Sequence, residues 1–530
     1  MAEQHYLIGV DVGTTGAKAV LTSDRGAILA EHASSYGVLT PKPLWAEQWP
    51  EVWLEGMAEA VRGLLERSRV DVRSVRAMTV SSLYGGSGIP VDADMTPVRP
   101  CLIWMDRRAQ AETEWVKGAI PLDELVRVTG NGVDSYYGFT KILWFKRHEP
   151  DLWKRTRYLL PPNAYLIYRL TGELAVDLSS AGNIGGVFDI GERTWSRSMT
   201  EALGIPMSLL PERLVASADV VGGLDATGAA ITGLPEGLPV CAGGVDAAVA
   251  TLSASVFRTG QHVAMMGTSM CWGFIHQQAP REAGLVSMPY VLDPHDTTYT
   301  FGGAATAGAV VKWFRDELGG VEQAVEQWTA GGANLNAYAE LDARAATLPA
   351  GAEGLLMLPY LMGERSPIWD PKARGTIVGL TLVHTRAHLY RAFLEGVAFA
   401  LRHNVDAGHA AGYPLDDQLL MVGGGAKSRL WTQIIADVTG FPVLAADSGG
   451  EAALGDAMLA ALGAGLADRN AIQTWVESAA LYRRFEPDPE AAASYARLYP
   501  HYVGLYEDLR DRFAAMAADV GDVPDAPPGD

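Results

Sequence analysis

The sequence has little cysteine, a shortage of positive charge and no long apolar run. Only three of its 530 residues are cysteine, namely Cys101, Cys241 and Cys271, and none belongs to a CxxC pair. An odd, sparse set gives no disulfide framework, so we expect a reducing, cytoplasmic setting. We interpret each cysteine as a small buried hydrophobe rather than a nucleophile or metal ligand.

The charge balance excludes some partners. The chain has 42 basic and 62 acidic side chains, a net charge of -20, which argues against a nucleic-acid surface or an acidic membrane surface. Apolar runs are interrupted well before the ~20 residues of a membrane span, and the N-terminus lacks the pattern of a signal peptide. A local phosphate site remains compatible with this charge, because backbone N–H groups and Mg²⁺ can build one.

Two familiar nucleotide motifs are also missing. The candidate for a P-loop, Gly423 to Ser428, lacks the glycine before its lysine and has the wrong spacing. The glycines at 9, 13 and 16 do not form a Rossmann fingerprint. The arrangement left is that of actin-like ATPases, in which two related domains each offer a phosphate hairpin.

The order of predicted elements indicates two large α/β domains. Strands are predicted at 6–11, 17–22 and 27–36, and the strand–Gly-Thr–strand pattern returns at 261–276, which suggests a duplicated domain. Helices and strands alternate between them, and this favours mixed sheets covered by helices. We place one domain at 1–256, a second at 257–515, and a disordered tail at 516–530.

The turn Gly13-Thr14-Thr15-Gly16 is the first candidate for chemistry. Its glycines allow a phosphate to approach the main chain, while Thr14 and Thr15 can donate hydrogen bonds. Asp11 would repel a phosphate directly, so its useful role is to hold Mg²⁺, directly or through water. The alternative is an ordinary hairpin with an Asx-type turn, which a string of this kind alone favours.

Asp246 follows Gly243 and Gly244 at the end of a predicted strand. It can be a helix N-cap, a common position for aspartate, or a general base that accepts the proton of a substrate hydroxyl. From the string alone the cap is the more frequent answer. Glu364 and Arg365, between Gly363 and Pro367, read as an ion pair in a solvated turn.

Taken together, these strings resemble the FGGY carbohydrate kinases, and especially their xylulokinase-like branch. The likeness covers about 6 to 485. Its segments are Ile8–Leu21, Pro43–Gln48, Ile103–Arg108, Gly138–Pro150, Gly243–Ala248, Met266–Ser269, Gly363–Pro367 with Gly379–Thr381, Val422–Trp431 and Ala452–Ala457.

The resemblance implies two RNase H-like, actin-like ATPase domains with a cleft between them, and Mg²⁺- and ATP-dependent phosphorylation of a small sugar in carbohydrate catabolism. It implies Asp246 as catalytic base and Asp11 as the Mg²⁺-linked aspartate. It implies substrate contacts from Trp104, Tyr136 and the position of Tyr84. The ATP and phosphate contacts that it implies are Gly13, Thr14, Thr15, Lys18, Gly267, Thr268, Gly308, Gly424 and Gly425.

One departure concerns the acceptor. Xylulokinases typically carry Gly-Gln-Met-His-Gly after the strand at 77–81, whereas this chain reads Ser81-Ser82-Leu83-Tyr84-Gly85. Tyr84 replaces the histidine, so we expect a pentulose such as xylulose with a shifted preference. The alternatives are another short polyol or ketose, or a non-catalytic actin-like ATP-binding protein. Beyond sugar and ATP we expect no nucleic-acid or membrane partner, and a homodimer is open.

Overall fold

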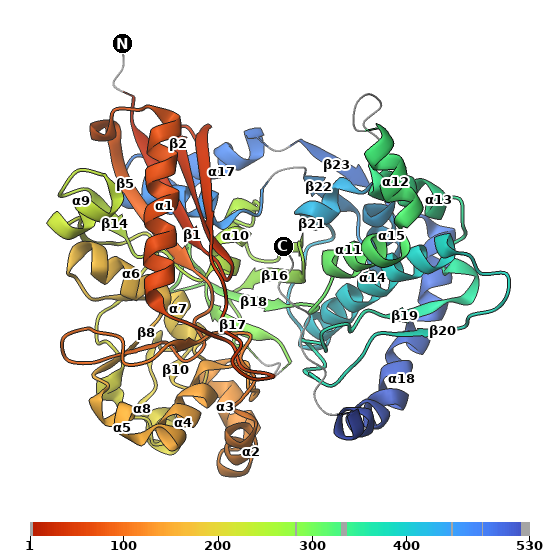
Figure 1. Ribbon diagram of the computed structural model, residues 1–530, viewed down its shortest axis with the longest axis horizontal. Helices are drawn as coiled ribbons and strands as arrows, with labels where there is room; N and C mark the ends of the chain where they lie inside the picture. Colours follow the sequence, from red (N-terminus) through yellow and green to blue (C-terminus); the bar gives the residue numbers. More distant parts are fainter. Residues whose placement is uncertain (1–3, 281–283, 330–335, 447–448, 480, 521–530) are drawn as a thin grey trace. The chain divides into compact units, whose positions relative to one another are not determined.

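The computed structural model describes residues 4–280, 284–329, 336–446, 449–479 and 481–520. It divides into two compact units (Figure 1). The first comprises Met1–Thr259, Ile275–Thr300 and Gly449–Ala479, and the second Gly260–Phe274, Phe301–Ser448 and Ala480–Asp530. The chain therefore crosses near the expected boundary at 256, but two later segments return to the first unit. The second of them, Gly449–Ala479, returns because its helix α16 (Ala452–Gly463) packs on the first strand of the chain.

The first unit is built on a six-stranded sheet in the order β13-β14-β5-β1-β2-β3. Strands β1 and β2 pair in antiparallel fashion, as do β2 and β3, while β5 lies parallel to both β1 and β14. Both predicted hairpin turns and all three N-terminal strands are present. The bounds are β1 Tyr6–Val12, β2 Gly16–Ser23, β3 Ile28–Ser35, β5 Val75–Ser82, β13 Val220–Gly223 and β14 Pro239–Cys241.

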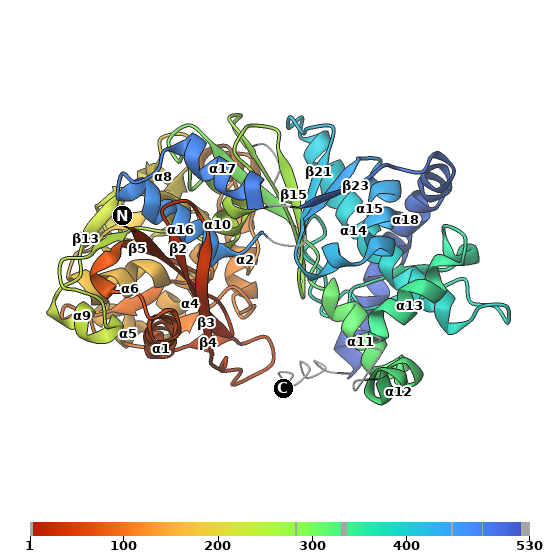
Figure 2. The same ribbon diagram turned by 90° about the horizontal axis from the view of Figure 1, so that it is seen from above.

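The two faces of β1 pack against different helices. Ile8, Val10 and Val12 alternate into a core with helix α1 (Pro50–Ser68), whose buried residues recur at helical spacing. Gly9 faces α16 so closely that a Cβ there would lie 1.9 Å from the Ala453 carbonyl oxygen. Figure 2 shows α1 and α16 on opposite sides of this sheet. Asp11, two residues after Gly9, consequently lies on the α16 face.

The remaining elements of the first unit carry the loops used below. They include β7 Cys101–Leu102, β9 Val176–Asp177, α2 Gln110–Ala119, α3 Leu122–Thr129, α4 Gly138–His148, α6 Pro162–Thr171, α7 Leu178–Asn183, α8 Arg197–Leu203, α9 Ala226–Thr232 and α10 Asp246–Ser253.

The second unit repeats this strand pattern. β16 (Met270–His276) pairs antiparallel with β15 (His262–Met266), which lies parallel to β21 (Leu419–Val422), and β21 lies parallel to β22 (Val443–Ala446). The same relation links β2, β1, β5 and β14. The second unit also contains β19 Leu356–Leu358, β20 Thr376–Val378, β23 Tyr482–Phe485, α11 Gly308–Leu318, α13 Ala337–Ala346, α14 Arg386–Ala410, α15 Arg429–Thr439 and α18 Pro489–Val520.

The expected tail needs a correction. Helix α18 runs to Val520, so the first residues of the segment 516–530 are helical, in keeping with their content of alanine. Residues 521–530 lie outside the described part of the chain. Cys101 and Cys241 are buried, as expected, whereas Cys271 is partly exposed. Among the described residues, no helix has the length and apolar character that a membrane-spanning segment needs.

Candidate functional site

The turn at Gly13–Gly16 joins β1 to β2 and is closed by the Gly13 N–H, which donates to the Gly16 carbonyl at 2.9 Å. Two of its carbonyl oxygens are occupied from within the unit. Tyr36 donates its hydroxyl to the Gly13 carbonyl at 2.8 Å, and Gln48 donates to the Thr14 carbonyl at 2.9 Å. Carbonyls that would repel a phosphate are thus engaged elsewhere, and the turn can offer N–H groups and threonine hydroxyls to an anion.

Asp11 lies opposite Lys18 in the antiparallel pair. Burial, followed by the charge of Asp246, raises the pKa of Asp11 to about 8, while Lys18 acts to lower it. Its buried Oδ1 atom has no hydrogen-bond partner among the residues that the structure describes. An orphaned carboxylate oxygen beside a second acidic group fits a hard divalent cation, whose charge would favour the ionised form. The site therefore fits Mg²⁺ on Asp11, directly or through water.

Other ligands for such an ion would come from water and nucleotide. Among the described residues, no group of three or more acidic, histidine or cysteine side chains is arranged to hold a metal. Lys18, predicted at a phosphate, has carboxylate partners in the structure: its Nζ lies 2.6 Å from Glu451 and 2.9 Å from Glu31. Its phosphate contact stays a prediction.

A further carboxyl group beside Asp11 was missed by the sequence reasoning. Asp456 of α16 is fully buried and accepts a hydrogen bond from the Ser81 hydroxyl, and Ser81 is the register partner of Asp11 in the β1–β5 pair. Burial raises the pKa of Asp456 well above its usual value, and the charges of Asp11 and Asp246 add to this. One signal was available, since Asp456 is the single charge in the apolar helix Ala452–Gly463.

Asp246 is the first residue of α10, and its side chain is partly exposed. Val245 holds the N-cap position without a side-chain cap bond, so Asp246 is not the helix N-cap. Its Oδ1 accepts the Ala247 N–H at 2.6 Å. Its charge also raises the pKa of Asp11. The first unit therefore brings together the two aspartates that the sequence analysis singled out.

The second Gly-Thr turn, Gly267–Ser269, is held by backbone rather than by side chains. The Ala307 N–H donates to the Thr268 carbonyl and the Gly308 N–H to the Gly267 carbonyl, each at 2.9 Å. Gly267 and Thr268 are exposed, and Gly308 is the first residue of α11. A turn next to a helix N-terminus is suited to binding an anion.

Glu364 is buried, which makes the interpretation of a solvated turn wrong for this residue. Its carboxylate accepts the N–H groups of Ala305 at 2.8 Å and Arg365 at 2.7 Å. Burial raises its pKa to about 7. Ser366 accepts the Gly303 N–H at 2.6 Å. The segment at 364–366 thus braces the loop that leads into Gly308.

Gly424 and Gly425 lie directly after β21. Gly425 is buried, and a Cβ there would lie 2.7 Å from the Cβ of Met266, whereas Gly424 is exposed. The turn ends at Ser428, which caps α15 by accepting the Trp431 N–H at 3.0 Å. An exposed glycine in a tightly packed turn leaves room for a flat ligand.

Three aromatic residues were predicted to contact the acceptor. The Trp104 indole N–H donates to Thr14 Oγ1 at 3.0 Å, so this ring is tied to the first phosphate turn. The rings of Tyr84 and Tyr136 pack with centroids 5.1 Å apart. The Tyr84 hydroxyl accepts the Gly138 N–H at the start of α4, and both tyrosines are buried. The three are brought to one region, and Tyr84 has a structural partner as well.

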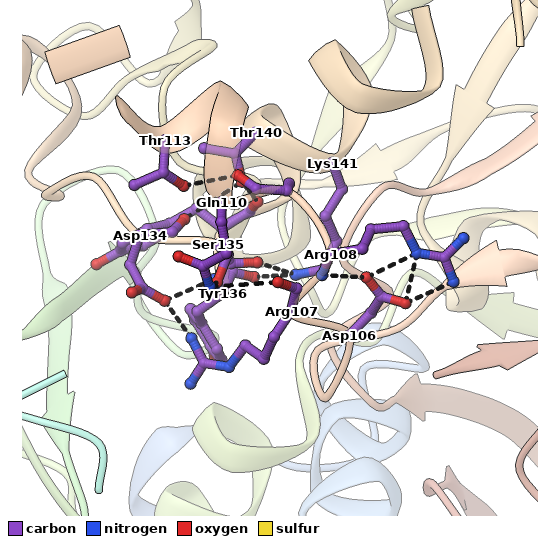
Figure 3. Close-up of polar contacts among 12 residues, drawn as sticks. Asp106, Arg107, Arg108, Gln110, Thr113, Asp134, Ser135, Tyr136, Thr140 and Lys141 are labelled. Carbon is purple, nitrogen blue, oxygen red and sulfur yellow. Dashed lines mark hydrogen bonds and ion pairs between the residues drawn. The ribbon is translucent and has the colours of Figure 1, made fainter. Parts of the chain in front are cut away.

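The loop that carries Tyr136 is held from several sides (Figure 3). Arg107 forms an ion pair with Asp134, whose Oδ1 also accepts the Tyr136 N–H at 2.7 Å. Lys141 is fully buried and donates to the carbonyls of Ser135 and Tyr136, at 2.7 and 2.5 Å. Burial lowers the pKa of Lys141 to about 7. These contacts fix the loop before any ligand is present.

Tyr84 also lines a small cavity of about 10 Å³ together with Ser82, Ser180 and Val245. This volume accommodates about one water molecule and no sugar. The cavity reaches the turn of Asp246, because Val245 precedes it.

Comparison with known proteins agrees with this arrangement. Residues 6–253 match the N-terminal domain of the FGGY family of carbohydrate kinases, and residues 262–464 match its C-terminal domain. The xylulose kinase of Bacillus subtilis is 31% identical over 96% of this chain and 98% of its own length.

Two solved structures are also similar. The xylulose kinase from Rhodospirillum rubrum has a TM-score of 0.83 and 30% identity, over 96% of this chain and all of its own. The gluconate kinase from Lactobacillus acidophilus has a TM-score of 0.85 and 25% identity, over 97% of this chain and all of its own. The expected fold of two actin-like ATPase domains is confirmed. The chain belongs to the FGGY family of carbohydrate kinases.

Proposed function

We propose that this carbohydrate kinase transfers the γ-phosphoryl group of ATP to a hydroxyl of a small neutral sugar, a pentulose such as xylulose. The observation that carries the proposal is the pair formed by Asp246 and Asp11. Asp246 opens a helix after a Gly-Gly turn, and Asp11 has a buried oxygen to which no group in the described part of the chain donates. A hydroxyl acceptor needs a base, and a phosphate donor needs a cation.

In the proposed reaction the Asp246 carboxylate accepts the proton of the acceptor hydroxyl. The oxygen then forms a bond to the γ-phosphorus, the bond to the β,γ-bridging oxygen breaks, and ADP leaves. The products are a sugar phosphate, ADP and a proton held at Asp246. Mg²⁺, when bound at Asp11, would offset phosphate charge. Thr14 and Thr15 would orient phosphate oxygens through N–H and hydroxyl groups, while Gly13, whose N–H closes the turn, would let the phosphate approach the main chain.

The second unit supplies groups suited to the nucleotide. Thr268 and Gly267 form an exposed turn beside the N-terminus of α11, where Gly308 begins the helix. We assign the phosphate hydrogen bond to Thr268, while Gly267 and Gly308, whose N–H groups are bonded within the loop, would let the phosphate approach closely. We assign the turn at Gly424 and Gly425 to the adenosine, because its exposed glycine permits close approach.

The charge around Tyr136 favours a neutral acceptor. The nearby guanidinium of Arg107 is already paired with Asp134, and the Lys141 ammonium donates its hydrogen bonds to backbone carbonyls. An acceptor carboxylate would have to compete with Asp134. Trp104 can lie against carbon-bound hydrogens of a sugar, and the tyrosine hydroxyls can reach its oxygens.

The test is a coupled ADP-release screen with and without Mg²⁺. It compares D-xylulose with its epimers and its enantiomer, with C4 and C5 polyols, and with gluconate as an acidic acceptor. We expect the highest kcat/KM for a ketopentose, with Tyr84 shifting the preference among stereoisomers, and no turnover in chelator. Highest kcat/KM for gluconate would overturn the neutral-acceptor proposal.

A further inference from the structure

The turn that carries Asp246 rests on a buried polar network that the sequence analysis did not single out. Ser179 Oγ accepts the Val245 N–H at 3.1 Å and donates to Asp177 Oδ1 at 2.5 Å. Asn163 Nδ2 donates to Asp177 Oδ2 at 2.8 Å and to the Ala242 carbonyl at 3.1 Å. The network therefore forms hydrogen bonds with the backbone on both sides of Gly243-Gly244, at Ala242 and at Val245.

The members of this network are sealed from water. Asn163 and Ser179 have no exposed surface, and Asp177 is 1% exposed. Asp177 also accepts the Ser180 N–H at 2.9 Å and so caps α7. Burial raises the pKa of Asp177, and its four hydrogen bonds act against that rise. A buried carboxyl group with this many donors is expensive to disturb, because removing one partner leaves another unsatisfied.

A second pair of contacts ties the same turn to the central strand. The Ser82 N–H donates to the Gly244 carbonyl at 3.1 Å. The Ser82 hydroxyl accepts the N–H of Asn163, also at 3.1 Å. The end of β5, the start of α6 and the turn are thus joined through one asparagine.

The two glycines are explained by this contact. Gly243 has a φ of +65°, and a Cβ there would lie 2.0 Å from the Val80 carbonyl oxygen. A Cβ at Gly244 would lie 2.8 Å from Ser179 Oγ. The turn therefore packs against β5 on one side and α7 on the other with no space for a side chain.

We propose that Asp177, Ser179 and Asn163 are positioning residues that hold Asp246 at the acceptor hydroxyl, an inference that rests on the proposed function. Their side chains are buried, so we assign them no contact with the acceptor. They act by fixing the backbone at Ala242 and Val245, on both sides of the glycines. Since the first residue of a helix inherits its direction from the turn before it, a fixed turn gives the Asp246 carboxylate one direction.

The test is a double-mutant cycle between Ser179→Ala and Asp246→Asn, with kcat, both KM values and thermal unfolding measured for each protein. We expect Ser179→Ala to lower kcat by about 10- to 100-fold, because small displacements of a reacting group have effects of this size. KM for ATP should change little. In the Asp246→Asn background the same substitution should cost almost nothing further, because its target is already gone.

The matched control is Ser196→Ala, which removes another buried serine of the first unit, the N-cap of α8. It should lower thermal stability and leave kcat unchanged in both backgrounds. Gly244→Ala tests the contact from the other side, by crowding Ser179 Oγ without removing any side chain of the network. It should lower kcat in the same non-additive way.

Two results would overturn the inference: an unchanged kcat for both Ser179→Ala and Gly244→Ala, or equal losses in the two backgrounds. Failure of the proposed function looks different. An unmodified enzyme that transfers no phosphate to any acceptor would reject that function, and the inference with it, before any variant is compared.

Discussion

The two Gly-Thr turns have the same strand geometry and different chemistry. The side chains of Tyr36, Gln48 and Trp104 hold the first turn, whereas the backbone N–H groups of the loop at 307–309 hold the second. Asp11 and Met265 each stand two residues before the first glycine of their turn. The hairpin is present in both units, and the charge that suits a cation is present in the first.

The largest effect on turnover is expected at Asp246, which lies in the same unit as the first turn. Asp246→Asn keeps the shape of the side chain but removes its ability to accept a proton, so kcat should fall by ~10²-fold or more. Binding of ATP, followed by calorimetry, should be nearly unchanged. Near-normal turnover of this variant would show that the base lies elsewhere.

The second test compares the positions before the two turns directly. Asp11→Ala should lower turnover at limiting Mg²⁺ by about tenfold or more, since even outer-shell changes at metal sites cost 10- to 100-fold. Met265→Ala should leave the Mg²⁺ dependence as it is. The measurement is initial rate against free Mg²⁺ at saturating ATP. Equal responses of the two variants would contradict a division of labour between the turns.

The segment at 364–366, which braces the loop next to the second turn, can be weakened without changing the first turn. Glu364→Ala removes the acceptor of the Ala305 and Arg365 N–H groups, which should cost about 1–3 kcal/mol of stability and raise KM for ATP a few-fold. Glu364→Gln keeps a carbonyl oxygen and should behave almost as the unmodified enzyme. Calorimetry and steady-state kinetics decide. If both variants raise KM for the sugar and leave KM for ATP unchanged, the assignment of this brace to the nucleotide side fails.

The smallest expected effect is on pH dependence. A carboxyl whose folded pKa is about 8, against an ordinary value of 3.8, holds its proton in the folded state after the unfolded chain has released it. Stability from this group is therefore present at low pH and is lost as pH rises from about 4 to 8. In metal-free buffer, the free energy of unfolding of Asp11→Asn, measured with denaturant, should fall less steeply with pH. The difference in slope should correspond to at most about one bound proton. An identical slope would place Asp11 in a more solvated setting.

Sequence reasoning succeeded where the signal is local. The strands predicted at 6–11 and 17–22 lie within β1 and β2, and the repeat predicted at 261–276 contains β15 and β16, because strand and turn patterns lie within a few neighbouring residues. It failed where partners are distant. Ser81 and Asp456 are 375 residues apart, and only the fold brings them together.

The acceptor region illustrates the same limit. The replacement of a histidine by Tyr84 was visible in the string, but the bond from Gly138 to its hydroxyl was not. Likewise Glu364 read as a surface charge because its neighbours are glycine, arginine and proline. Its burial follows from packing against the loop at 303–307, which no local pattern reports.

The packing of α16 on β1 has a consequence for how the protein is made. Gly9 and Asp11 emerge early from the ribosome, yet the helix that covers them begins at Ala452. The first stretch of the first unit ends at Thr259, roughly 200 residues before this helix. At ordinary rates of synthesis these residues take about 10–40 s to translate. During that interval the face of β1 that holds Asp11 is uncovered, so a nascent or truncated chain lacking α16 presents an unfinished sheet surface to other proteins.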